Sequence, residues 1–141
     1  MKKILIFFFT FATLFSCEST NTETRIFDPI IGTWRLTSMT LDGKEADTRT
    51  ACEKRSTSTF LENGTTTINN FYDGNDNGND SCESANGTSI WENLGNSIYK
   101  VQDDGETTEI NFSENNTIFS VSKSEIYNST TYTITFIYRK Q

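Results

Sequence analysis

The sequence predicts an all-β fold, an up-and-down antiparallel meander that closes into a barrel of about eight strands. Short alternations of apolar and polar side chains recur from Pro29 onward. Hairpin signals such as Asp42-Gly43 and Asn63-Gly64 separate many of these alternations. No window of eleven residues shows a helical period. Such a meander has to hide its edge strands. A closed barrel does so completely, and a sandwich of two four-stranded sheets is the competing arrangement.

Eight segments alternate in this way, and each is bounded by turn signals. They span residues 33–41, 56–61, 65–72, 88–93, 97–102, 107–112, 117–123 and 130–138. The last has the clearest alternation, because threonines separate an apolar stripe made of Tyr132, Ile134, Phe136 and Tyr138. An eight-stranded barrel is just wide enough to be filled by side chains or to admit one small ligand. We expect this stripe to fill the barrel, with a ligand-lining wall as the alternative.

The N-terminus resembles a bacterial lipoprotein signal peptide. Lys2 and Lys3 precede a run of about eleven mostly apolar residues, well short of the ~20 that a membrane-spanning helix needs. The run ends at Leu14-Phe15-Ser16-Cys17, which resembles the lipoprotein cleavage motif. The resemblance implies that residues 1–16 are removed and that Cys17 carries a diacylglyceryl group with palmitate-like acyl chains. An ordinary secretory signal is the alternative, and it exports the chain as well.

This assignment divides the chain into three parts. Residues 1–16 are the signal peptide, residues 17–28 are the lipidated cysteine and a flexible tether, and residues 29–141 are the barrel domain. Two or three acyl chains hold a protein firmly on a bilayer, so we expect attachment to a membrane through the lipid. We expect the protein in the cell envelope, anchored to the outer membrane, as a monomer.

Composition narrows the classes of function. Loss of Lys2 and Lys3 with the signal peptide lowers the formal charge from −7 to −9, and no basic cluster is present to neutralise the phosphates of a nucleic acid. The chain has no histidine, the commonest general base and metal ligand. The carboxylates, including Glu92 and those of residues 103–106, show no spacing that places two acids in one cleft. We therefore expect no enzyme, no catalytic residues and no cofactor.

Two motifs near the start of the barrel carry a resemblance to a known family. Ile30-Ile31-Gly32-Thr33-Trp34 resembles the Gly-x-Trp that opens the first strand of lipocalins, and Phe60-Leu61-Glu62-Asn63-Gly64 resembles the hairpin of bacterial lipocalin-like lipoproteins. The resemblance covers roughly residues 29–139. It implies an eight-stranded lipocalin-like barrel in which Gly32 and Trp34 lie at the closed end. It also implies that Arg139 stacks on the Trp34 ring through a cation–π contact.

Cys52 and Cys82 remain as an even pair once Cys17 is assigned to lipid. An exported chain meets an oxidising compartment, where such pairs form disulfides. The two cysteines flank the predicted hairpin of residues 56–72, in the loops before its first strand and after its second. An antiparallel hairpin brings those points together, so we expect a Cys52–Cys82 disulfide, with two free thiols as the alternative.

A segment rich in aspartate, asparagine and glycine begins at Asp73. Its pattern matches the first half of a calcium-binding loop, but position twelve is Ser84 instead of glutamate. The same residue types dominate ordinary solvated loops. We therefore expect no metal site, and the only weak candidates for metal ligands are Asp73, Asn75, Asn77 and Asp80.

Two hypotheses about function follow. The first is a lipoprotein whose barrel holds a small, mostly apolar molecule. The second is a non-catalytic structural or interaction lipoprotein whose barrel is filled by its own side chains. A cavity of a few hundred cubic ångströms lined by aromatic and aliphatic side chains favours the first hypothesis.

The lipid anchor gives a direct test. Substitution of Cys17→Ala removes the only acylation site that the lipoprotein motif offers, so the protein should move from the membrane pellet to the soluble fraction. Immunoblotting of fractionated cells measures this. Co-sedimentation of the variant with membranes at the wild-type level would rule out the lipoprotein signal.

Overall fold

The computed structural model describes residues 27–76, 79–101 and 105–141. The predicted signal peptide, the lipidation site Cys17 and all of the tether before Phe27 lie outside these ranges. Within them the chain forms strands and one short 3-10 helix: β1 (Gly32–Leu41), β2 (Lys44–Glu45), η1 (Glu53–Arg55), β3 (Thr57–Phe60), β4 (Thr65–Asp76), β5 (Asn79–Gly95), β6 (Ile98–Val101), β7 (Thr107–Glu109), β8 (Asn111–Ser113), β9 (Ile118–Tyr127) and β10 (Thr130–Lys140). No helix in the described part of the chain is long and apolar enough to cross a membrane.

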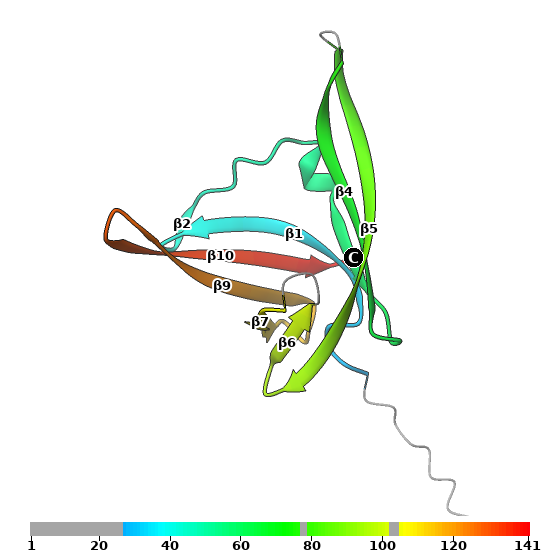
Figure 1. Cartoon of the computed structure of the whole chain (residues 1–141), viewed down its shortest axis with the longest axis vertical. Coiled ribbons are helices and arrows are strands. Elements are labelled where there is room, and N and C mark those ends of the chain that lie inside the picture. The colour runs from blue at the N-terminus through cyan, green and yellow to red at the C-terminus, as the bar shows by residue number, and fades with distance from the viewer. Residues whose placement is uncertain (1–26, 77–78, 102–104) are drawn as a thin grey trace, which may run out of the picture.

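The strands form one antiparallel meander in the order β7-β6-β5-β4-β3-β1-β10-β9-β8, with β2 paired to β1 (Figure 1). The two ends of this order, β7 and β8, are consecutive pieces of one broken strand. β7 pairs with β6, β8 pairs with β9, and Ile110 joins them. The Ile110 N–H donates to the Ser97 carbonyl at 2.8 Å and its side chain is buried. The barrel therefore closes through the chain at Ile110, where the strand changes partner.

The predicted fold class is confirmed, and each predicted segment contains or overlaps a strand of the structure. The predicted strand 107–112 is broken into β7 and β8 at Ile110. β4 and β5 extend much further than predicted, to Asp76 and back from Asn79. The segment around Cys82, which we expected to be a loop, is therefore a ladder in which Asp73 pairs with Cys82 and Gly74 with Ser81. Residues with polar side chains can form this ladder because the hairpin pairs their backbone N–H and C=O groups.

The hydrophobic core lies at the closed end of the barrel. Trp34 is fully buried, and its ring packs edge-on against Phe119 with centroids 4.6 Å apart. Its indole N–H donates to the Ile30 carbonyl at 2.6 Å. This hydrogen bond satisfies the polar end of a large aromatic side chain that would otherwise be costly to bury. The other buried members of the cluster come from the N-terminal turn, three strands and the link between β7 and β8: Ile30, Phe60, Tyr99, Phe119 and Ile110.

The turn before β1 is fixed to the opposite side of the barrel by Asp28. Its Oδ1 accepts hydrogen bonds from the Ile30 N–H at 3.0 Å and from the Tyr99 hydroxyl at 2.8 Å, and its Oδ2 accepts one from Asn93. Burial, together with the Asp28 carboxylate, raises the pKa of Tyr99, which keeps its hydroxyl protonated as a donor. The first residues of the domain thus seal the closed end.

The cation over Trp34 is Lys140, not the predicted Arg139. Trp34 pairs with Lys140 across β1 and β10, so their side chains share the inner face, whereas Arg139 pairs with Arg35 on the outer face. Lys140 Nζ lies 5.1 Å from the Trp34 ring centroid, and the exposed Arg139 lies 3.4 Å from Glu114. Sequence resemblance missed the residue by one position, and one position reverses the face of a strand.

Gly32 makes room for this lysine. Its φ is +132°, and a β-carbon there would lie 2.5 Å from Lys140 Cε. A side chain at this position would therefore be strained by the backbone and would displace the lysine from Trp34. The glycine of the Gly-x-Trp motif has a packing role at the closed end.

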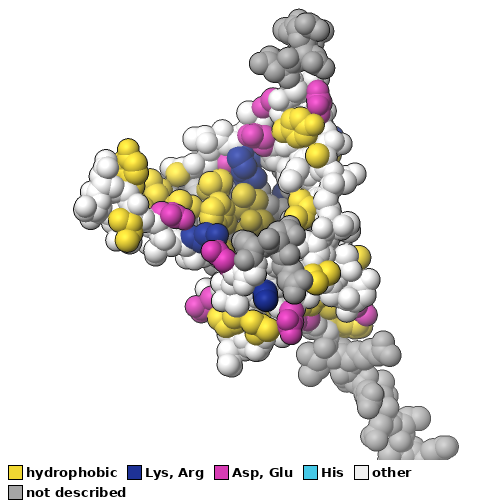
Figure 2. All heavy atoms as spheres, in the orientation of Figure 1, with side chains coloured by type: hydrophobic (Ala, Val, Ile, Leu, Met, Phe, Trp, Pro, Cys, Tyr) yellow, Lys and Arg dark blue, Asp and Glu magenta, His cyan; other side chains and the backbone are white. Residues whose placement is uncertain are grey.

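Two hairpins extend from the other end of the barrel and diverge (Figure 1). One is the outer part of β4 and β5, and the other is the outer part of β9 and β10, with β1 beside β10. The bridging segment, residues 46–56, crosses from β2 to β3 between these two hairpins and contains η1. Hydrophobic side chains gather in the hollow between the hairpins, with lysine and arginine side chains at its edge (Figure 2).

Truncation of the buried tryptophan tests the closed end. Trp34→Ala should lower the free energy of unfolding by about 3–5 kcal/mol, as for other buried aromatic side chains. Trp91→Ala is the matched control. Because Trp91 is only partly buried, this variant should lose less free energy of unfolding. Urea denaturation of both variants measures the difference. Equal losses would show that Trp34 has no special place in the core.

Candidate functional site

The barrel holds a cavity that is partly open to solvent and mostly apolar, which we call the apolar lobe. Its volume is about 360 Å³. Aromatic and aliphatic side chains from β3, β6, β9 and β10 and from Ile110 supply most of its wall: Phe60, Tyr99, Val101, Ile110, Phe119, Val121, Phe136 and Tyr138. Phe136 and Tyr138 belong to the stripe that we expected to fill the barrel. That expectation is wrong at these two positions, where the stripe forms part of a cavity wall.

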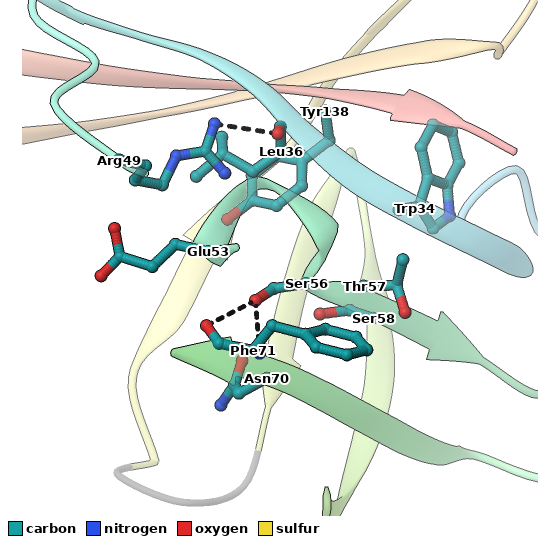
Figure 3. Close-up of a pocket in the computed structure, with 10 residues that line it drawn as sticks. All are labelled: Trp34, Leu36, Arg49, Glu53, Ser56, Thr57, Ser58, Asn70, Phe71 and Tyr138. Atoms are coloured by element: carbon teal, nitrogen blue, oxygen red, sulfur yellow. Dashed lines mark hydrogen bonds between the residues drawn. The ribbon is translucent and has the colours of Figure 1, made fainter. Parts of the chain in front are cut away.

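A second cavity of about 300 Å³ adjoins the first, and we call it the polar lobe (Figure 3). It lies between β1, β3, β4 and the bridging segment. Trp34, Leu36 and Phe71 supply apolar wall, and the remaining lining residues carry polar groups: Arg49, Glu53, Ser56, Thr57, Ser58, Asn70 and Tyr138. Arg55 lies over the outer side of this wall, with its guanidinium carbon 4.3 Å from the Phe71 ring centroid.

Tyr138 and Ser58 line both lobes, so they stand where the two cavities meet. The Tyr138 ring stacks on Phe119 with centroids 4.5 Å apart and planes 21° from parallel. Burial raises the pKa of the Tyr138 hydroxyl, and the nearby Arg49 guanidinium opposes this in part. The hydroxyl is therefore protonated at neutral pH and can both donate and accept a hydrogen bond.

An ion pair in the bridging segment forms the outer edge of the polar lobe. Arg49 binds the Asp47 carboxylate through Nε and Nη2, both at 2.9 Å. Nη2 also donates to the Leu36 carbonyl on β1 at 2.9 Å, as Figure 3 shows. Only 5% of the Asp47 side chain and 16% of the Arg49 side chain are exposed. The pair therefore fastens the bridging segment to β1.

The hydrogen bond from Arg49 holds the pKa of Asp47 at about 2, below the usual 3.8, although burial of the carboxylate opposes this. Lys54 adds a weaker attraction, with Nζ 3.7 Å from Oδ2. The carboxylate is therefore ionised throughout the physiological range, and it balances the charge of Arg49 at the edge of the lobe.

A disulfide fastens the other side of the bridging segment, as predicted. Cys52, just before η1, is bonded to Cys82 in β5, and their Cα atoms are 5.6 Å apart. This separation is typical of disulfides. In the chain-entropy view, closing a loop of this length stabilises the fold by roughly 3.5–4 kcal/mol. The bridging segment is thus attached to β1 through Arg49 and to β5 through Cys52.

The weak metal candidates lie on the β4–β5 hairpin. Asp73 is exposed, and Asn75 pairs with Asp80 across the ladder. Asn77 lies outside the described residues. Among the described residues, no group of three or more carboxylate or cysteine side chains could hold a metal ion. The backbone follows an extended ladder up to Asp76, so residues 73–76 do not form the coiled start of a calcium-binding loop.

The sequence did not indicate the residues of the polar lobe. Asp47, Arg49 and Glu53 lie in a segment without periodicity, where charged residues usually face solvent. The spacing Asp-x-Arg does permit a local ion pair, but the contact with Leu36 depends on how the segment crosses the barrel. Among the residues of the lobes, only the aromatic ones were indicated by the sequence, because they alternate with polar residues along the predicted strands.

The ion pair predicts a pH dependence. The pKa of Asp47 is about 2 in the folded protein and near 3.8 in the unfolded chain, so the unfolded state binds the proton first as pH falls. This contribution to stability is complete above about pH 4 and disappears as pH falls towards 2. Asp47→Asn should flatten the decline in melting temperature over that window, measured by circular dichroism. Asp73→Asn, at an exposed carboxylate, is the control and should leave the decline unchanged.

Known proteins include a matching family and several structures of distant similarity. The sequence profile described as a lipocalin-like domain matches residues 30–119, which is more than half of the chain. Curated proteins give no match. Among solved structures, the siderocalin Ex-FABP shares 11% identity over 81% of this chain and 71% of its own, with a TM-score of 0.42.

Two other similar structures are a bovine odorant-binding protein in complex with its natural ligand and lobster apocrustacyanin A1. The first shares 14% identity over 80% of this chain and 72% of its own, with a TM-score of 0.41. The second shares 12% identity over 84% of this chain and 64% of its own, with a TM-score of 0.46. At these levels the likenesses carry no argument about ligands. The profile match alone shows the family, and the chain belongs to the lipocalin-like domain family.

Proposed function

We propose that this protein is a non-catalytic cell-envelope lipoprotein whose barrel binds a small, mostly apolar molecule. The observation that carries this proposal is the apolar lobe. Its volume of about 360 Å³ lies within the range of small-molecule pockets. Its wall consists mainly of aromatic and aliphatic side chains from strands that the closed end holds in place. Each square ångström of apolar surface that a ligand buries there contributes about 25 cal/mol.

The alternative, a barrel filled by its own side chains, accounts less well for this interior. Packed protein interiors leave few voids larger than a water molecule. Here two adjoining cavities of about 300 and 360 Å³ remain beside the core. Seven aromatic residues make ring contacts in and around the closed end, so the sequence provides enough bulk to pack that end and still leaves the lobes open: Trp34, Phe60, Trp91, Tyr99, Phe112, Phe119 and Tyr138.

The proposed lipid anchor fits this geometry. The domain begins at the closed end, where Tyr99 and Asn93 hold Asp28. A tether from Cys17 to Asp28 can span at most about 35–40 Å when extended. A lipid on Cys17 would therefore place the closed end nearest the membrane, which we propose is the outer membrane, and leave the cavities free for ligand entry.

Filling the apolar lobe tests the binding function. Val121→Trp adds bulk to a side chain of the lobe wall, so it should weaken binding of the neutral fluorescent probe N-phenylnaphthylamine by at least about tenfold. Because the new ring enters an existing cavity, the loss of stability should stay below the roughly 1–3 kcal/mol that overpacking a filled core costs.

The matched control is Thr131→Trp, which adds the same bulk at an exposed position on β10 and should bind the probe like the wild type. Mass spectrometry of protein purified from its own envelope under mild conditions then identifies the retained molecule. Unchanged probe binding in Val121→Trp, together with a large loss of stability, would favour the filled barrel.

A further inference from the structure

We infer that the ligand is a neutral amphiphile, with an uncharged head that forms hydrogen bonds in the polar lobe and an apolar chain in the apolar lobe. This inference rests on the proposed function and names the class of molecule that the site accepts. Three features carry it: the two residues that line both lobes, the balance of charge around the polar lobe, and the hydroxyl groups at their junction.

The two lobes offer one ligand two different environments. They meet at Ser58 and Tyr138, which line both. On one side the wall is mostly aromatic and aliphatic, and on the other side most lining residues carry polar groups. A wholly apolar ligand that extended into the polar lobe would remove water from hydroxyl groups such as those of Ser58 and Tyr138 without replacing its hydrogen bonds, which is unfavourable. A ligand with one polar end avoids this.

The charges around the polar lobe do not select a charged head. Arg49 and Glu53 are the two ionised residues of its wall, and their formal charges cancel. The Arg49 charge is further balanced by Asp47, which holds the guanidinium through two hydrogen bonds of 2.9 Å. An acidic head that drew Nε and Nη2 of Arg49 away from Asp47 would leave a buried carboxylate without its partner, which is strongly destabilising.

A basic head is disfavoured for a related reason. Glu53 Oε2 already accepts the Thr50 N–H at 2.8 Å, and Arg49 stands in the same wall. Lys54 and Arg55 lie just outside the lobe, where they contact Asp47 and Phe71. The five ionised residues of this region carry a formal charge of +1, so the region as a whole does not attract a cation.

Hydroxyl groups at the junction suit an uncharged head. The close-up shows the Ser58 and Tyr138 side chains directed into the cavity (Figure 3). Within the described part of the chain, neither hydroxyl forms a hydrogen bond to another residue. Each can donate and accept. An alcohol, a glycerol ester or a primary amide can also do both, and it would engage these groups without disturbing the Asp47–Arg49 pair.

A ligand series with one chain tests this inference. We would measure displacement of N-phenylnaphthylamine by lauric acid, its glycerol monoester, its primary amide and dodecane, on the full-length protein at neutral pH and below micelle-forming concentrations. The monoester and the amide should bind at least about tenfold more tightly than the acid and the alkane. Tighter binding of the acid would overturn the inference.

Removal of single hydroxyl groups then locates the head. Ser58→Ala and Tyr138→Phe should each weaken binding of the monoester by about two- to tenfold relative to binding of dodecane, which is the effect of one hydrogen bond. Ser124→Ala and Tyr127→Phe remove the same groups at exposed positions. They should leave the affinity of the monoester relative to that of dodecane unchanged. Equal binding of all four ligands, unaffected by these variants, would overturn the neutral head but leave apolar binding intact. Failure of every ligand to displace the probe, together with probe binding that Val121→Trp does not change, would overturn both proposals.

Discussion

The rest of the structure depends on the burial of Trp34 at the closed end of the barrel. Its ring contacts Phe119, its N–H is satisfied by the Ile30 carbonyl, and Lys140 Nζ lies over its ring. These partners come from β9, the N-terminal turn and β10, so one side chain joins segments from both ends of the domain. Because the ladders of an antiparallel meander alone are compatible with an open sheet, these contacts favour closure at this end.

The cavities follow from this packing. Because the largest aromatic side chains gather around Trp34, the strands further along carry smaller residues on their inner faces, such as Ser58, Thr108 and Val121. The Tyr138–Phe119 stack marks the limit of the packed region, next to the place where the two lobes meet. The closed end thus gives the barrel a rigid base, and rigid walls allow a pocket to select its ligand.

The polar lobe depends on a segment that has almost no regular structure. Residues 46–56 are held by contacts that include the ion pairs of Asp47 with Arg49 and Lys54, the Arg49–Leu36 and Ser56–Phe71 hydrogen bonds and the Cys52–Cys82 disulfide. Each joins the segment to a different strand or balances a charge that burial would make costly. This arrangement explains how a charged loop can line a cavity for an uncharged group: Asp47 and Arg49 satisfy one another, and the remaining hydroxyl groups are free to bind a ligand.

The sequence by itself determined the strands, because alternation and hairpin signals are local, and it indicated Trp34 and the Cys52–Cys82 pair. It also fixed the absence of histidine and the acidic charge. The tertiary structure decided which neighbour covers Trp34, since one step along a strand exchanges Arg139 for Lys140. It decided that the broken strand closes the barrel at Ile110. It also placed Asp47 and Arg49 at a cavity, because the path of a loop across a barrel depends on contacts distant in the sequence, which no local pattern records.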